Sequence, residues 1–288
     1  MSEGNEQPIW DHLDELAKRL RRILLSVAIA TIVLASLPSD LNRLAKLDFS
    51  NYRPMISAVI ELIQNRLLPD EVNLIAFTWL DTFYIFIIVA VALGTLISLP
   101  VIAYEIYQFV SPALFPAERK SVFGFVAVFT MLFAMGASYA YFILLPTTFR
   151  VLLRFVYQTR IAPLFSVRDF FNIVAFGLLG SGLFYTFPLM IFVLVKFDLM
   201  DIQTLRSNRK QIFVGLLIVT AVLTPDPTPL SMILMVIPFY LLYELTIQIV
   251  GRMKIGEKRE DDVERGIRLS RELLEKAEEP ISAQEKIK

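Results

Sequence analysis

The chain has 288 residues, of which 56% are hydrophobic and only 19% are charged, so it is too apolar for a soluble domain of this length. Its 28 basic residues balance its 28 acidic ones, so no overall positive charge points to nucleic acid as a partner. Cysteine is absent, which excludes disulfides, thiolate metal sites and cysteine nucleophiles. The composition predicts an all-α polytopic membrane protein in contact with lipid.

Residues 1–22 are predicted to form a polar, amphipathic lead-in to the first span. Apolar residues recur in it at intervals of three and four, as one face of a helix requires. They are Leu13, Leu16, Leu20 and Leu24. No small-residue cleavage pattern follows the first apolar run, so we expect residues 23–37 to be retained as a span. This span is short and must extend into its flanks or lie where the bilayer is thin.

Residues 38–80 are predicted to be a long loop that contains one amphipathic helix. Pro54 suits the start of this helix and Pro69 ends it, and we expect it to cover one end of the bundle. Two uncharged apolar runs follow, at residues 82–104 and 121–145. A run of 23 residues makes roughly 34 Å of helix, which is enough to cross a hydrocarbon core of about 30 Å. Both runs are therefore predicted spans.

Residues 109–120 form a short connection between these two spans. Pro112 and Pro116 stiffen it, and it ends in Glu118, Arg119 and Lys120. Because residues 109–120 connect the end of one predicted span to the start of the next, we expect these charges at a membrane surface. Glu118 should lie within one helical turn of the lipid. We interpret Glu118 as the centre of the functional site.

The rest of the chain is predicted to complete a six-span membrane domain over residues 23–250. After a loop at residues 146–168, which we expect to contain an interfacial helix, spans are predicted at residues 170–195, 211–223 and 230–250. The fifth makes only about 20 Å of helix and cannot fully cross an unperturbed bilayer. Residues 251–288 are predicted to be a mixed-charge tail, either a solvated helix or disordered, and we assign it no chemistry.

An even number of spans places both termini on one side of the membrane. Twenty of the 28 lysine and arginine residues then lie on the side of the termini and of residues 109–120, and eight lie on the other side. Short cytoplasmic segments carry the excess of basic residues. The sequence therefore predicts that both termini and residues 109–120 are cytoplasmic.

Glu15 and Glu118 lie on the same membrane face in this topology, and the residues alone leave two interpretations open. In the first, both are structural charges: Glu118 favours the N-terminus of its span, and Glu15 pairs with Lys18 or Arg19, each contributing about 0.2 to 1 kcal/mol. In the second, two carboxylates on a partly dry surface hold guanidinium groups through bidentate hydrogen bonds.

Several motifs, in order along the chain, resemble the C subunit of the twin-arginine protein translocase, the TatC family. They are HLDEL at residues 12–16 with Lys18-Arg19-Leu20, residues 109–120, Leu223-Thr224-Pro225-Asp226, Ile237-Pro238-Phe239-Tyr240, and Glu244. The similarity covers about residues 8–250. It implies a multi-pass protein of a prokaryotic cytoplasmic membrane, whose six helices form a concave, cupped bundle.

The resemblance also implies a site and a source of energy. In this family two glutamates bind the paired arginines in the signal peptide of a folded cargo protein, and they correspond to Glu15 and Glu118 here. The same signal-peptide-binding surface is expected to include Phe109, Arg119, Lys120, His12, Leu16 and Arg19. The family uses the proton-motive force, and no nucleotide-binding motif is present in the sequence.

The resemblance further implies single-span partner subunits of the TatA/TatB type and self-association in a larger complex. Family members often carry a carboxylate or an amide for this contact in the fourth span, where this chain has Thr186, whose hydroxyl can bond to a helix carbonyl. Glu244 and Asp226 are the other expected partner contacts. A charge within a span is a functional candidate, but for Glu244 a structural role near Arg252 stays open, and Asp226 is also suited to bracing its proline-rich turn.

Other classes of function have less support in the sequence. His12 is the only histidine and has no second histidine or cysteine with which to form a metal site. No nucleophile and base pair or dinucleotide signature is present, so we expect no metal, no cofactor and no enzyme, an intramembrane hydrolase included. A secondary transporter of a small solute is the alternative, although the internal repeats and midplane ionisable residues typical of such folds are not evident.

Overall fold

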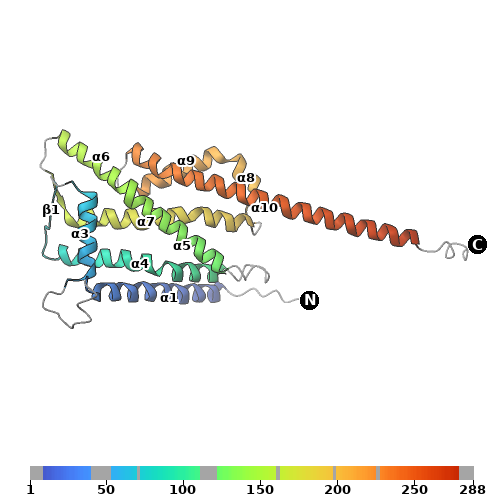
Figure 1. Cartoon of the computed structure of the whole chain (residues 1–288), viewed down its shortest axis with the longest axis horizontal. Coiled ribbons are helices and arrows are strands. Elements are labelled where there is room, and N and C mark those ends of the chain that lie inside the picture. Colours follow the sequence, from blue (N-terminus) through green and yellow to red (C-terminus); the bar gives the residue numbers. More distant parts are fainter. Residues whose placement is uncertain are drawn as a thin grey trace, which may run out of the picture.

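The computed structural model describes residues 9–39, 53–69, 72–110, 122–159, 163–196, 199–224 and 228–278. Over these residues the protein is a bundle of helices with one small pair of strands (Figure 1). The helices are α1 (Ile9–Ser36), α3 (Met55–Leu67), α4 (Asp81–Val110), α5 (Val122–Tyr139), α6 (Leu145–Gln158), α7 (Val167–Lys196), α8 (Ile202–Ser207), α9 (Arg209–Leu223) and α10 (Pro229–Glu278). The prediction of an all-α fold is confirmed.

Four stretches of helix within the described residues are long and apolar enough to cross a bilayer. They are Asp81–Phe109, Val122–Gln158, Val167–Lys196 and Pro229–Met253. Two predicted spans fall on α1 and α9, which are not among these four. The first half of α1 is charged, and α9 has only 15 residues, which make about 22 Å of helix.

Helix α7 is the central helix of the bundle (Figure 1), and it packs against α4, α5 and α10. It contributes to all three hydrophobic cores, through Phe171, Tyr185 and Leu189 among others. Its contact with α5 requires small residues, because a Cβ added to Gly136 would lie 2.7 Å from the Cβ of Tyr185, and one added to Gly182 would overlap an aromatic ring of α5. The glycines therefore let these two helices approach closely.

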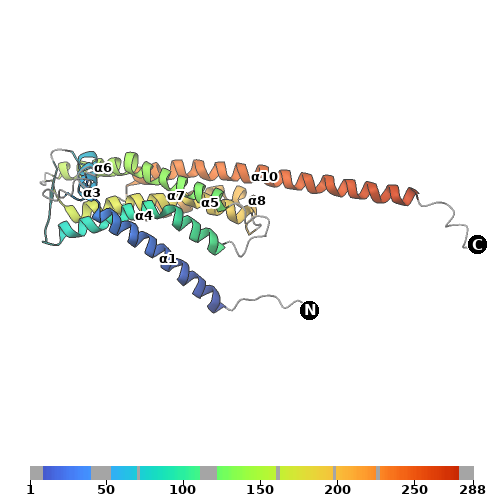
Figure 2. The ribbon, with the colours of Figure 1, turned by 60° about the horizontal axis from the view of Figure 1, so that its bottom comes forward.

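Helix α1 packs along α4 in the opposite direction, on the outside of the bundle (Figures 1 and 2). The two backbones approach at Gly94, where an added Cβ would lie 3.0 Å from the backbone nitrogen of Thr31. Leu24, Ile29 and Ile32 on α1 are exposed, so an apolar face of this helix is left to lipid. This pairing places the first half of α1 beside the C-terminal end of α4.

Helix α3 and a two-stranded parallel sheet lie at the opposite end of the bundle. The helix begins after Pro54 and buries Ile56, Ile63 and Leu67 against α4, α6 and α7, as the apolar stripe in the sequence predicts. Strands β1 (Asn73–Ile75) and β2 (Leu164–Ser166) pair beside it. The sequence gives no prediction of these strands, since three residues are too few for an alternating pattern.

The prediction that a loop begins after residue 145 is wrong. A π-helix, η3 (Ala140–Leu144), joins α5 directly to α6. Pro146 lies in the first turn of α6, a position that proline tolerates. The continuous helix Val122–Gln158 has 37 residues and is about 55 Å long, which exceeds the thickness of a bilayer core. Helix α6 therefore continues this span without a break and packs on α3. A helix lies where one was expected within residues 146–168, and its interfacial position stays a prediction.

Helix α10 has 50 residues and continues well past the bundle in both views (Figures 1 and 2). The tail at residues 251–288 is predicted to be either a solvated helix or disordered, and its backbone is helical up to Glu278. The first turns of α1, the last turns of α4 and the far end of α10 all lie toward the same end of the bundle. This arrangement is consistent with an even number of spans.

Candidate functional site

A cluster of charged side chains lies between α1 and α4, at the end of the bundle opposite α3. It consists of Glu15, Arg19 and Arg22 on α1 and Glu105 on α4, and we call it the α1–α4 charge cluster. The three residues of α1 are spaced by four and three positions, so they share one helix face. The antiparallel packing of the two helices brings Glu105, in the last turns of α4, onto this face.

Arg19 joins the two carboxylates of the cluster. Its Nε donates to Oε1 of Glu15 at 3.0 Å, and its Nη2 forms an ion pair with the same oxygen. Its Nη1 donates to Oε2 of Glu105 at 3.3 Å. The second arginine, Arg22, donates from Nη1 to Oε1 of Glu105, also at 3.3 Å. Glu105 thus holds two guanidinium groups that come from the neighbouring helix.

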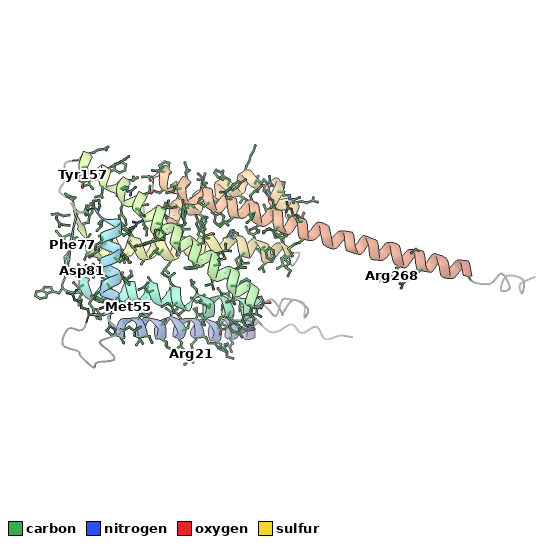
Figure 3. The ribbon with its side chains drawn as sticks, viewed as in Figure 1. Arg21, Met55, Phe77, Asp81, Tyr157 and Arg268 are labelled. Carbon is green, nitrogen blue, oxygen red and sulfur yellow. The ribbon has the colours of Figure 1, made fainter. Side chains whose placement is uncertain are left out.

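The members of the cluster differ in exposure. The exposed fraction of the side chain is 6% for Glu105, 15% for Arg19, 29% for Glu15 and 62% for Arg22. Burying a carboxylate as deeply as Glu105 costs desolvation energy that opposite charge close by offsets, and the two arginines supply that charge. Arg21 on the same helix points away from the bundle instead (Figure 3).

Four of the predicted signal-peptide-binding residues have described side chains, and all four lie at this end of the bundle. Glu15 pairs with Arg19, which is one of the two pairings that the sequence left open. Leu16 is exposed. Phe109 is half-buried and lies four residues after Glu105, on the same face of α4. The structure therefore brings predicted residues from two separate segments to one place.

The remaining predicted signal-peptide-binding residues, and Asp226 among the expected partner contacts, lie outside the described part of the chain, wholly or by their side chains. Residues 111–121 are not described, and they include Glu118, Arg119 and Lys120. The same holds for Asp226, and of His12 only the backbone is described, in α1. The segment that carries Glu118 follows Val110, so it leaves α4 at the end that carries the charge cluster. That Glu15 and Glu118 lie on the same membrane face stays a prediction.

Glu105 is a site residue that the sequence reasoning missed. The predicted span ended at residue 104 because the uncharged run ends there, but α4 continues to Val110 and the candidate span continues to Phe109. Glu105 is therefore a second carboxylate within a candidate span, beside Glu244. The sequence feature that could have indicated this residue is the position of Glu105 directly after the uncharged run at residues 82–104. An acid at the end of a span can be reached by arginines at the start of the helix packed beside it.

Glu244 on α10 has an arginine partner, though not the expected one. Nη2 of Arg209, at the start of α9, lies 2.8 Å from Oε1 of Glu244, whereas the sequence suggested Arg252. The exposed fraction of the Glu244 side chain is 26%. The pair joins the beginning of α9 to α10, which gives Glu244 a structural role.

Thr186 on α7 is buried, with 3% of its surface exposed. Its hydroxyl donates to the backbone oxygen of Leu183 at 2.6 Å, so its polar group is satisfied within its own helix, as the sequence allowed. A partner subunit could reach this hydroxyl only after neighbouring helices had moved. A contact through Thr186 stays a prediction.

Comparisons with known proteins identify the family. The family model described as "Sec-independent protein translocase protein (TatC)" matches residues 11–238. The chain belongs to the TatC family. The TatC of a Blattabacterium from Periplaneta americana is 32% identical, over 86% of this chain and 96% of the relative. The TatC of Aquifex aeolicus is 29% identical, over 88% of this chain and 98% of the relative.

The fold agrees with this assignment to the TatC family. The crystal structure of a twin-arginine translocase receptor, TatC, matches with a TM-score of 0.66 and 28% sequence identity, over 84% of this chain and 98% of that one. The resemblance that the motifs predicted is confirmed. This TatC family member is a bacterial membrane protein and a Sec-independent protein translocase subunit, and these matches favour that function over transport of a small solute.

Proposed function

We propose that this TatC family member is the core receptor and scaffold of a twin-arginine translocase, and that it binds the signal peptides of folded cargo proteins. The binding surface is the end of the bundle that carries the α1–α4 charge cluster. In this proposal that end faces the cytoplasm, together with residues 1–22 and 251–288, and residues 23–250 form the domain in the cytoplasmic membrane. The proton-motive force drives export.

The observation that carries the proposal is the position of Glu15. Its carboxylate is partly exposed at the end of the bundle where the chain leaves α4 toward Glu118. A guanidinium group fits a carboxylate through two parallel N–H···O bonds, so two carboxylates suit two neighbouring arginines. Phe109 and the exposed Leu16 offer apolar contacts beside them. His12, Arg19, Arg119 and Lys120 complete the proposed surface.

The experiment is photo-crosslinking of a twin-arginine signal peptide to the purified protein. Glu15→Ala and Glu118→Ala should each reduce crosslinking at least tenfold, because a lost charged hydrogen-bond pair costs about 1.5 to 3 kcal/mol. A peptide with two lysines in place of the arginines should also bind more weakly, since an ammonium group cannot form the bidentate contact.

The matched control for these two variants is Glu61→Ala. Glu61 is an exposed glutamate on α3, at the opposite end of the bundle, and its replacement should leave crosslinking unchanged. Equal crosslinking by the parent protein and the two site variants would refute the site. Equal affinity for the arginine and lysine peptides would refute recognition of guanidinium.

We further propose that single-span subunits of the TatA/TatB type contact the chain through Glu244, Thr186 and Asp226, and that copies of the chain associate in a larger complex. Support comes from Glu244, whose second oxygen, Oε2, is buried without a hydrogen-bond partner among the described residues. Glu244→Gln should then release a co-purifying single-span subunit. Arg209→Gln, which changes the other member of the same ion pair, should retain it, and loss from both variants would argue for a purely structural pair.

A further inference from the structure

The α1–α4 charge cluster contains a carboxylate that the proposed binding surface does not use. Glu105 is nearly buried and is held by Arg19 and Arg22, so it is not placed to meet a peptide directly. A buried charge at this position needs a reason, because an apolar residue would fill the same space with less desolvation. The reason lies in the charge balance around Glu15.

Glu15 lies on a strongly basic face of α1. Lys18, Arg19 and Arg22 follow it at three, four and seven positions, which places all of them on its side of the helix, and Arg19 is already in contact with it. Among the side chains that the structure describes, these basic residues would outweigh the carboxylate of Glu15 if no other negative charge were near. A peptide with two arginines would then be repelled from the residue that is proposed to bind it.

Glu105 supplies the missing negative charge. Within the cluster, two carboxylates face two guanidinium groups, since Glu105 takes Arg22 and shares Arg19 with Glu15. The exposed residues Asp14 and Lys18 add one charge of each sign and leave this balance unchanged. Because Glu105 lies between two helices and away from bulk water, its charge is poorly screened and acts on Arg19 and Arg22 at close range.

We infer that Glu105 is a positioning residue of the receptor, which holds Arg22 and shares Arg19 with Glu15, and so supplies the negative charge that lets Glu15 accept a guanidinium group. The inference rests on the proposed function, because it concerns the same peptide surface. Glu105 acts through the two arginines and does not touch the peptide. The net charge of the cluster, rather than the identity of any one member, then sets the affinity for a twin-arginine peptide.

The test is fluorescence anisotropy of a labelled twin-arginine peptide with the purified full chain in nanodiscs. Glu105→Gln leaves the cluster with one excess positive charge and should weaken binding about tenfold, a typical effect of one unscreened charge at this range. The double variant Glu105→Gln/Arg22→Gln restores the balance and should bind within about threefold of the parent. The effect of Glu105→Gln should shrink in 1 M salt, where the screening length falls to about 3 Å.

Rescue by the second substitution separates charge balance from a structural role, since removing a further ion-pair partner would not repair a damaged structure. If Glu105→Gln yields no folded protein, Arg22→Gln alone tests the same balance, because Arg22 is largely exposed. It should tighten binding about threefold. Glu61→Gln, at the opposite end of the bundle, is the control for loss of a carboxylate and should have no effect.

Each outcome decides the inference. Unchanged binding by Glu105→Gln, a double variant that binds no better than Glu105→Gln, or unchanged or weaker binding by Arg22→Gln would overturn it. If the parent protein binds the arginine peptide no better than the lysine peptide, the proposed function itself fails. If the parent protein discriminates between the peptides and the variants do not behave as stated, only the role of Glu105 fails.

Discussion

The two ends of α4 each bury a carboxylate, and the two carboxylates are held in different ways. Asp81 accepts hydrogen bonds from the backbone nitrogens of Phe77 and Thr78, both at 2.9 Å, and from the Thr78 hydroxyl at 2.7 Å. Arg168 completes its set at 2.9 Å. Glu105, at the other end, is held by arginine side chains of α1 at 3.3 to 3.4 Å.

The surroundings of the two carboxylates extend this difference. Arg168 lies over the ring of Tyr84 at 4.6 Å, and the Tyr84 hydroxyl donates to Asn172 at 2.7 Å, so α4, α7 and the turn before α4 are tied together (Figure 3 labels Asp81 and Phe77 at this end). Short bonds to the backbone fix Asp81 in one arrangement. Longer contacts with flexible arginines, one of them mostly exposed, let the partners of Glu105 adjust. One end of α4 is built for stability, and the other is suited to recognition.

The largest expected effect on stability is at the Asp81 end. Asp81→Ala removes three hydrogen bonds and an ion pair and should lower the free energy of unfolding by about 3 kcal/mol. The measurement is the apparent melting temperature of the purified protein in detergent. Glu105→Gln should cost less than about 1 kcal/mol, since Arg22 can turn to solvent and Arg19 keeps Glu15. A larger loss for Glu105→Gln than for Asp81→Ala would reverse the roles assigned to the two ends. Asp169→Asn, which changes an exposed acid, is the control.

The middle of α4 offers a second variant, which should affect both properties. In Gly94→Ala the new methyl group would overlap the Thr31 hydroxyl and would also lie 3.0 Å from the Thr31 backbone nitrogen. The backbone cannot yield as a side chain can, so overpacking should cost about 2 kcal/mol. The substitution should push α1 away from α4, and with it Glu15 and Arg19 away from Glu105. It should therefore also weaken binding of the twin-arginine peptide. Gly215→Ala is the matched control, since its Cβ meets nothing within 4 Å. A stable Gly94→Ala protein with normal peptide binding would contradict the close α1–α4 contact.

The ion pair between Arg209 and Glu244 is a further test of the comparison between Asp81 and Glu105. Its loss should have the smallest effect on the free energy of unfolding. The pair has a short distance of 2.8 Å, as at Asp81, but both side chains are partly exposed, at 43% and 26%. Glu244→Gln should therefore lower the free energy of unfolding by only about 1 kcal/mol, measured by the same melting experiment. A loss as large as that of Asp81→Ala would show that bond length, rather than the number of fixed partners, separates the two ends of α4.

Long apolar runs and prolines made most of the helices predictable. The uncharged run at residues 82–104 leads to α4, and Pro54 with an apolar stripe leads to α3, because both signals act locally. The continuation through Pro146 could not be predicted in the same way. A proline in a first turn and a proline that ends a helix look alike in sequence, and the π-helix before it depends on packing of Ala140 and Leu144 in the core.

The candidate site was predictable where local patterns carried it. Glu15 and Arg19 are four residues apart on one helix, so their pairing follows from spacing. Glu105 is 86 residues away from Arg19, and their contact depends on the antiparallel packing of α1 on α4. The spacing of residues along the sequence does not show which residues of two packed helices lie at the same level along their axes. The roles of Glu118, Arg119 and Lys120 in the site rest on the sequence motifs and stay predictions.

The unbroken course of α10 has a mechanical consequence. One helix runs from Pro229, within the bundle, to Glu278, and about 25 residues of it follow the candidate span that ends at Met253. These residues make a rod of about 38 Å, so a tilt of the membrane-embedded part by about 10° would displace the far end by about 7 Å. A small tilt of the helix within the bundle would therefore produce a larger displacement at Glu278, which a single spectroscopic label at that position could record.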